Sequence, residues 1–131
     1  GVHLETTQLY NRYFGVSRFK NKPWYGQNYG SDNDNFYHFF SAGGLDFIVL
    51  FFEYNAGSDV LGWADSVLKK YKERRAIVVS HSLLKLDGTF GFQGRATYDV
   101  LKDNSNFSSY EIRKIIEIKL ERCTFSFKQY T

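Results

Sequence analysis

One stretch of this chain constrains the fold more than any other: a strand, an amphipathic helix and a second strand that ends in a histidine. The run Phe47 to Phe52 is almost continuously apolar, which is typical of a strand buried on both faces. Residues 58–74 repeat apolar side chains at helical spacing, with Ser58 or Asp59 expected as the N-cap. A second β-branched run follows at 76–80, directly before His81. This order predicts two parallel strands joined by a crossover helix.

The flanking segments predict an α/β domain with a mixed sheet and one or two crossover helices. Residues 35–40 alternate as a strand, and a turn at 42–44 joins them to the apolar run as a hairpin. Residues 6–14 predict a short helix, residues 15–35 a loop and residues 95–102 another short helix. After the break at 103–106, the pattern favours a helix to about residue 121 and then a strand.

Length and composition exclude several classes of protein. The 131 residues predict a single domain, residues 1–131. The net charge of +3, without a dense basic stripe, indicates no nucleic-acid partner. The single Cys123 excludes an intrachain disulfide. No apolar run is long enough for a membrane helix and no signal peptide is recognised, so the sequence predicts no membrane partner. Because the chain begins at Gly1 and contains no Met, we expect a fragment or processed piece.

His81 is the main candidate for chemistry, because ligands and metals collect at the carboxyl ends of parallel strands. Glu53, at the end of the preceding strand, is expected either to orient His81 or to pair with an Arg. His38 lies in an aromatic strand, where a structural role is expected. Asp65 is expected to be solvated on the helix.

An aromatic loop offers a second, different kind of candidate. Trp24, Tyr25 and Tyr29 are interleaved with polar residues, and they are expected either to fold over an edge of the core or to stack on a sugar or base. The Gly-rich stretch 88–94 lacks the Lys of a phosphate-binding loop, and no nucleophile elbow is present.

Five segments, taken in order, resemble the calcineurin-like metallophosphoesterases. They are Asp34-Asn35-Phe36-Tyr37, Phe47-Ile48-Val49-Leu50, Glu53-Tyr54, Leu61-Gly62-Trp63-Ala64 and Ile77-Val78-Val79-Ser80-His81. In that family a strand ending near Leu-Glu-Phe/Tyr precedes a helix carrying Trp-Ala, and the next strand ends in Thr-His. Gly1-Val2-His3-Leu4 is similar to the family's Gly-Asn-His-Asp motif. The resemblance covers residues 1–106 and leaves residues 107–131 as a divergent tail.

The resemblance implies part of a metallophosphoesterase-like sandwich around divalent metals (Mn, Fe or Zn) that activate water against a phosphate ester. It implies His81 as a metal ligand and His3 as the second candidate. The chain departs from the family at Val2, which replaces a bridging Asn, and at Leu4, which replaces an acid. The family's other ligand motifs, including the late Gly-His-x-His, are not found. We therefore expect a phosphoesterase-derived domain that is incomplete or inactive as this chain.

The alternative is a non-catalytic domain that binds a partner or forms a homo-oligomer. Half of a sandwich leaves apolar faces and open sheet edges, which favour association. The divergent tail fits a gene fragment, a frameshifted product or a repurposed domain, and the sequence leaves these three open.

Overall fold

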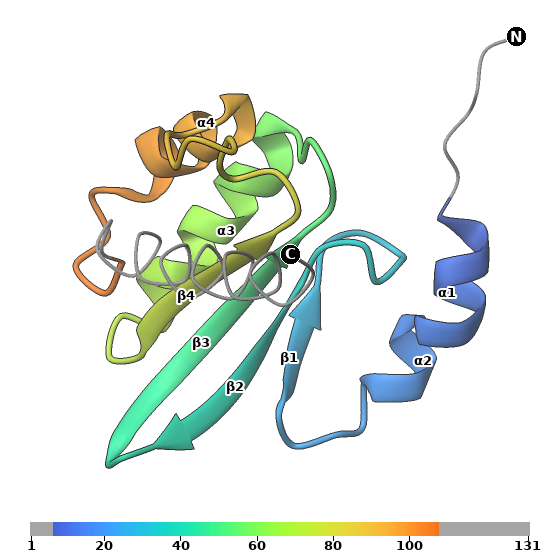
Figure 1. The fold of residues 1–131 in the computed structure, drawn as a ribbon. Coiled ribbons are helices and arrows are strands. Elements are labelled where there is room, and N and C mark those ends of the chain that lie inside the picture. The colour runs from blue at the N-terminus through green and yellow to red at the C-terminus, as the bar shows by residue number, and fades with distance from the viewer. Residues whose placement is uncertain (1–6, 108–131) are drawn as a thin grey trace, which may run out of the picture.

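The structure, a computed structural model, describes residues 7–107 and has the predicted α/β architecture with a mixed sheet (Figure 1). The strands lie in the order β1 (Tyr25–Asn28), β2 (Phe36–Ala42), β3 (Leu45–Phe52) and β4 (Arg75–Ser80). The helices are α1 (Gln8–Phe14), α2 (Val16–Phe19), α3 (Ser58–Lys70) and α4 (Phe92–Leu101). Within the described residues, no helix is long and apolar enough to cross a bilayer.

The hairpin and the crossover are both confirmed. β2 and β3 pair antiparallel around a turn in which Gly43 and Gly44 have φ angles of 59° and 76°. Such angles are accessible to glycine at little cost, and they match the turn to the twist of the strands. β3 and β4 pair in parallel, with Leu50 beside Val78, and α3 connects them.

The core lies between one face of the sheet and α3. Ile48, Leu50 and Ala76 point to this face and have no exposed surface. The buried side of α3 repeats at helical spacing, through Val60, Leu61, Ala64, Val67 and Leu68. α4 lies beside α3 on the same face (Figure 1). Helix propensity alone would not hold α3 in place; its apolar side is stabilised by packing on the sheet.

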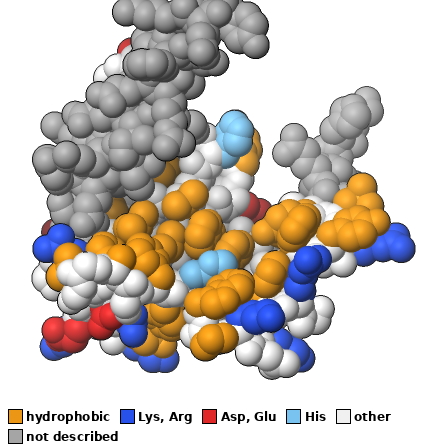
Figure 2. Space-filling model, turned by 60° about the horizontal axis from the view of Figure 1, so that its bottom comes forward, with side chains coloured by type: hydrophobic (Ala, Val, Ile, Leu, Met, Phe, Trp, Pro, Cys, Tyr) orange, Lys and Arg blue, Asp and Glu red, His pale blue; other side chains and the backbone are white. Residues whose placement is uncertain are grey.

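The opposite face of the sheet is only partly covered, although Val49 of the apolar run 47–52 is buried on it, as expected for that run. Cross-strand neighbours on this face stack ring on ring, with centroids 4.7 Å apart for both Phe36–Phe51 and Phe40–Phe47. Phe40 and Val79 are nevertheless 43% and 41% exposed. Figure 2 shows hydrophobic side chains gathered into one patch with a histidine among them. We call this face, made by Tyr25, Phe36, His38, Phe40, Phe47, Val49, Phe51, Ile77 and Val79, the open face.

The predicted loop 15–35 is wrong in part, because it contains α2 and β1. Both elements are only four residues long, too short to show a hydrophobic period. β1 also depends on a contact that the sequence pattern does not reveal. The Tyr37 ring lies where a side chain at Gly26 would be, with its nearest atom 2.0 Å from an ideal Cβ position. The strand therefore needs glycine at this position.

The ends of the two longer helices also differ from the prediction. Gly57, not Ser58 or Asp59, is the N-cap of α3, and no side chain caps it. Asp59 instead accepts a hydrogen bond from the Tyr29 hydroxyl at 2.8 Å. α3 ends at Lys70, short of the predicted residue 74, and α4 begins at Phe92, before the predicted residue 95. The predicted helix and strand after residue 107 lie outside the described residues.

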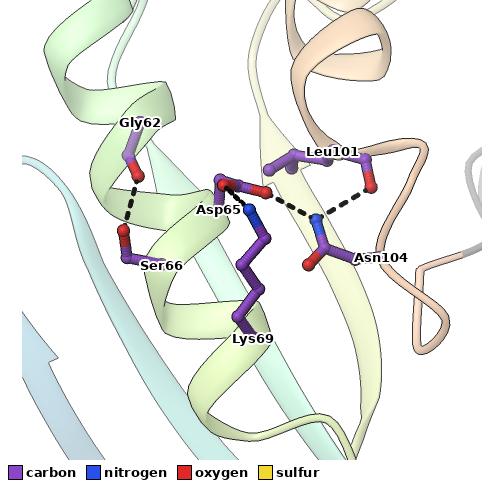
Figure 3. A network of polar contacts seen from close by, with 6 residues as sticks. All are labelled: Gly62, Asp65, Ser66, Lys69, Leu101 and Asn104. Atoms are coloured by element: carbon purple, nitrogen blue, oxygen red, sulfur yellow. Dashed lines mark hydrogen bonds and ion pairs between the residues drawn. The ribbon is translucent and has the colours of Figure 1, made fainter.

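Asp65 is part of a polar network, which corrects the prediction of a solvated carboxylate (Figure 3). It accepts hydrogen bonds from Lys69 Nζ at 2.7 Å and from Asn104 Nδ2 at 2.8 Å. Asn104 also donates to the Leu101 carbonyl at the end of α4. The hydrogen bonds from Lys69 and Asn104 hold the pKa of Asp65 below its usual value. The network thus joins α3 to the segment that follows α4.

Candidate functional site

The candidate site lies at the carboxyl ends of the two parallel strands. Glu53 directly follows β3, and His81 directly follows β4. Phe52 and Ser80 are partners in the parallel register, so the two strands end at the same level. The pattern of strand endings therefore places both residues at one edge of the sheet, as the sequence predicts.

Glu53 is paired with an amide, not with an Arg or with His81. Its Oε1 accepts a hydrogen bond from Asn35 Nδ2 at 2.7 Å, and its backbone N–H donates to Asn35 Oδ1 at 3.1 Å. Asn35 is buried and precedes β2. This reciprocal pair explains why a carboxylate is tolerated here: the amide satisfies both a side-chain oxygen and a backbone donor.

Gln93 is the site residue that the sequence analysis missed. It is 4% exposed, and its Nε2 donates to the Glu53 carbonyl at 3.0 Å. Its Oε1 accepts hydrogen bonds from the Asn55 N–H at 2.8 Å and from the Ser82 hydroxyl. One buried amide thus fixes the loops that follow β3 and β4. The signal in the sequence is a polar residue at a buried position of α4, which is recognisable only once the start of the helix is known.

Gly94 allows α4 to approach this site. An ideal Cβ at Gly94 would lie 1.8 Å from the Leu83 carbonyl oxygen, so any side chain would displace the backbone of the loop after β4. The close approach brings Gln93 within reach of both loops.

The segment around α1 is tied to the same end of the sheet. Thr7, the first described residue, donates through its hydroxyl to Asp34 at 2.6 Å, and Asn11 Nδ2 donates to the other oxygen of Asp34 at 2.6 Å. Asp34 adjoins Asn35, the partner of Glu53. The candidate ligand His3 precedes Thr7 by four positions and lies outside the described residues.

The two described histidines lie in different environments. His81 is exposed, and no hydrogen bond or ion pair to it is found within residues 7–107. His38 is on the open face, where its ring lies 4.6 Å from Trp24 and 4.9 Å from Phe36 between centroids. Its Nε2 has no partner among the described residues, and burial lowers the pKa of His38. These contacts fit the structural role expected for His38.

The three aromatic residues proposed for stacking do not form one platform. Tyr25 is 8% exposed and donates its hydroxyl to Asn33. Trp24 packs on His38, whereas Tyr29 packs on Trp63 of α3, 5.7 Å between centroids. Tyr25 also packs on His38, so Trp24 and Tyr25 lie together on the open face while Tyr29 lies against α3, and the three rings form no common stacking surface.

The described donor set does not by itself fit a divalent metal. Among residues 7–107, no group of three or more His, Cys, Asp or Glu side chains is arranged to hold an ion. Catalytic sites for such metals use three or more protein ligands with an open position. Oε1 of Glu53 already accepts a hydrogen bond from Asn35. His81 would need ligands from elsewhere.

Comparison with known proteins finds a relative in Bacillus subtilis (strain 168), the uncharacterized protein YvnB. The two sequences are 32% identical over 100 residues, which is 76% of this chain and 8% of YvnB. This chain therefore spans a small part of a much longer relative, whose name states no activity. No family model and no solved structure matches the chain.

Proposed function

We propose that this chain is a metallophosphoesterase-derived domain that keeps the scaffold position of one metal ligand, His81, without the rest of the ligand set. The observation that carries the proposal is the placement of His81 at the end of β4, level with the end of β3. In open α/β sheets this edge is where ligands bind. The phosphoesterase resemblance of the segments around Glu53 and His81 supplies the reaction class, hydrolysis of a phosphate ester.

The polar network behind His81 supports this proposal. Asn35 and Gln93 hold Glu53, directly after β3, through hydrogen bonds of 2.7–3.1 Å, and Gln93 also accepts one from the hydroxyl of Ser82, which follows His81 in sequence. A buried network of this kind fixes the backbone that carries a metal ligand. In metal sites, residues that hydrogen-bond to the ligands or to their backbone have this role. The network holds the geometry of the loops but supplies no second metal ligand beside His81.

The incomplete donor set among residues 7–107 leads to a clear expectation about activity. Water activation by metals requires that the ions be held firmly at an open site. We therefore expect this chain alone not to hydrolyse phosphate esters, and the ligands that complete the site in a phosphoesterase to belong to other segments of chain.

The test is a hydrolysis assay on the full chain with an aryl phosphate monoester and diester, in the presence of Mn²⁺, Fe²⁺ or Zn²⁺. The proposal predicts rates equal to those of the metal-only blank, for wild type and for His81→Ala. His38→Phe is the matched control, since His38 lies on the open face. Metal-dependent hydrolysis that disappears in His81→Ala and persists in His38→Phe would show that the ligand set is complete.

A second candidate, self-association through the open face, is favoured by the exposure of Phe40 and Val79. Apolar patches of this kind on a soluble domain mark interaction surfaces. Val79 lies on the open face and is exposed, so a charge placed there would enter the interface. Light scattering at rising protein concentration should show a dimer or larger species for wild type and a monomer for Val79→Lys. A wild-type monomer throughout would remove this candidate.

A further inference from the structure

The helices at the edge of the sheet, and Trp24 after them, carry large apolar side chains that are exposed. Neither α1 nor α2 has a buried residue. Leu9, Tyr13 and Phe14 are 70%, 58% and 48% exposed, and Tyr10 and Trp24 are 41% and 39% exposed. The positions 9, 10, 13 and 14 form one stripe of a helix. A contiguous exposed apolar stripe on a soluble domain indicates a binding surface.

Positive charge is concentrated in the same place. Between Thr7 and Ser31 the chain has four basic residues and no acidic one. All four are exposed, and they are Arg12, Arg18, Lys20 and Lys22. In Figure 2 Lys and Arg side chains lie beside hydrophobic ones on the side that α1 and α2 occupy in Figure 1. We call these four residues, with Leu9, Tyr10, Tyr13, Phe14 and Trp24, the α1–α2 surface.

Two rings of this surface, Tyr10 and Phe14, already turn one face toward each other. Phe14 is stacked on Tyr10, 5.6 Å between centroids, and the Arg18 guanidinium lies 5.6 Å from the Phe14 centroid. Trp24 packs on His38 and Phe19. Stacking of nucleic-acid bases requires free ring faces. The edges of these rings, with Leu9, suit insertion into an apolar layer better than base stacking.

The surface is also held rigidly on the domain. Asn33 Nδ2 donates to the Phe14 carbonyl at 2.8 Å, and the Asn33 N–H donates to Asn11 Oδ1 at 2.7 Å. Arg18 donates to the Tyr13 carbonyl at 3.0 Å. These bonds fix α1 from its inner side while the apolar stripe faces outward. Binding would therefore require little reordering of the chain.

We propose that the α1–α2 surface binds the face of an anionic lipid bilayer. Exposed Leu, Phe, Tyr and Trp side chains enter the boundary between headgroups and acyl chains, and basic residues around them pair with anionic headgroups. The sequence predicts no membrane partner, but that prediction considers only a long apolar run and a signal peptide. Outside this segment the remaining 13 basic and 14 acidic residues nearly balance, so the positive charge of the chain is concentrated here. The proposal is independent of the phosphoesterase proposal.

The experiment is co-sedimentation of the full chain with vesicles of phosphatidylcholine alone, or of phosphatidylcholine and phosphatidylserine at about 7 to 3. Binding is expected to the anionic vesicles and at least tenfold less to the neutral ones. Lys20→Glu with Lys22→Glu should reduce anionic binding on the order of thirtyfold, since each Lys near an anionic leaflet contributes about a factor of five. Leu9→Ser with Tyr13→Ser should reduce it as well.

The matched control is Lys72→Glu with Lys85→Glu, two exposed lysines outside the α1–α2 surface, which should leave binding unchanged. The substituted side chains are all exposed, so we expect every variant to keep the melting temperature of the wild type. An unchanged melting temperature then excludes misfolding as the cause of weaker vesicle binding. No binding to anionic vesicles, equal binding to neutral ones, or an equal loss in the control variant would overturn the proposal. The proposal would also be overturned if a single-stranded oligonucleotide displaced the protein from the vesicles at a lower concentration than free lipid headgroup does.

Discussion

The two faces of the sheet are both apolar, yet within residues 7–107 only one of them is closed. Under α3, Ile48 and Leu50 have no exposed surface, whereas on the open face Phe40 and Val79 are 43% and 41% exposed. The closed face is covered by the crossover helix that chain order requires. The open face is covered in part by its own stacked rings. An apolar sequence pattern therefore shows which faces of a sheet need burial, but it does not show which element covers them.

The largest difference between the faces should appear when one core side chain is truncated on each. Leu50→Ala removes a fully buried side chain and should cost about 3 kcal/mol of unfolding free energy, because a cavity remains. Phe40→Ala on the open face should cost about 1 kcal/mol or less, since its main partner is one cross-strand ring. Denaturant unfolding measures both values. Equal losses would contradict the distinction between the two faces.

Two glycine substitutions on the helices that cover the closed face should change stability in opposite directions. Gly94→Ala should lower stability by about 2 kcal/mol, because the added Cβ meets the Leu83 carbonyl oxygen. Gly62→Ala, on α3, meets no atom within 4 Å and should raise stability by up to about 1 kcal/mol through helix propensity. Thermal unfolding of both variants shows whether each substitution lowers or raises stability. A neutral Gly94→Ala would show that α4 does not need its close approach.

The smallest effect concerns pH and the open face. His38 contacts the rings of Trp24, Tyr25, Phe36 and Phe51, and this burial lowers its pKa below that of the unfolded chain. The proton is then bound more readily in the unfolded state. Stability is full above about pH 6.5 and falls as the pH drops below it.

The measurement is the melting temperature of wild type and His38→Phe between about pH 7.5 and about pH 5. The wild type should lose more stability than the variant over this range. Parallel curves would mean that protonated His38 is accommodated among the rings as well as the neutral form is.

The strand–helix–strand unit could be predicted from the sequence because its elements are long and their periods differ. Eight residues of β3 and thirteen of α3 give clear patterns, and the order of elements then fixes a parallel pair. The position of His81 at the strand end follows from the same argument. β1 and α2 could not be predicted, because four residues carry no period and the Gly26–Tyr37 contact is non-local.

The polar part of the site was less accessible to sequence reasoning. Glu53 is a plausible partner for an Arg or for His81 in the sequence, and its actual partner is Asn35, eighteen positions earlier. Gln93 is forty positions from the Glu53 carbonyl that it binds. Hydrogen bonds between distant loops depend on how α4 docks on α3, and no local pattern encodes that docking.

The central claim is that this chain keeps the position of a metal ligand without a complete metal site. Elemental analysis of the full chain, after incubation with Mn²⁺, Fe²⁺ and Zn²⁺ and removal of free ions, tests it most directly. We expect far less than one bound ion per chain, with the same content in wild type and in His81→Ala. A near-stoichiometric metal content that is lost in His81→Ala would contradict it.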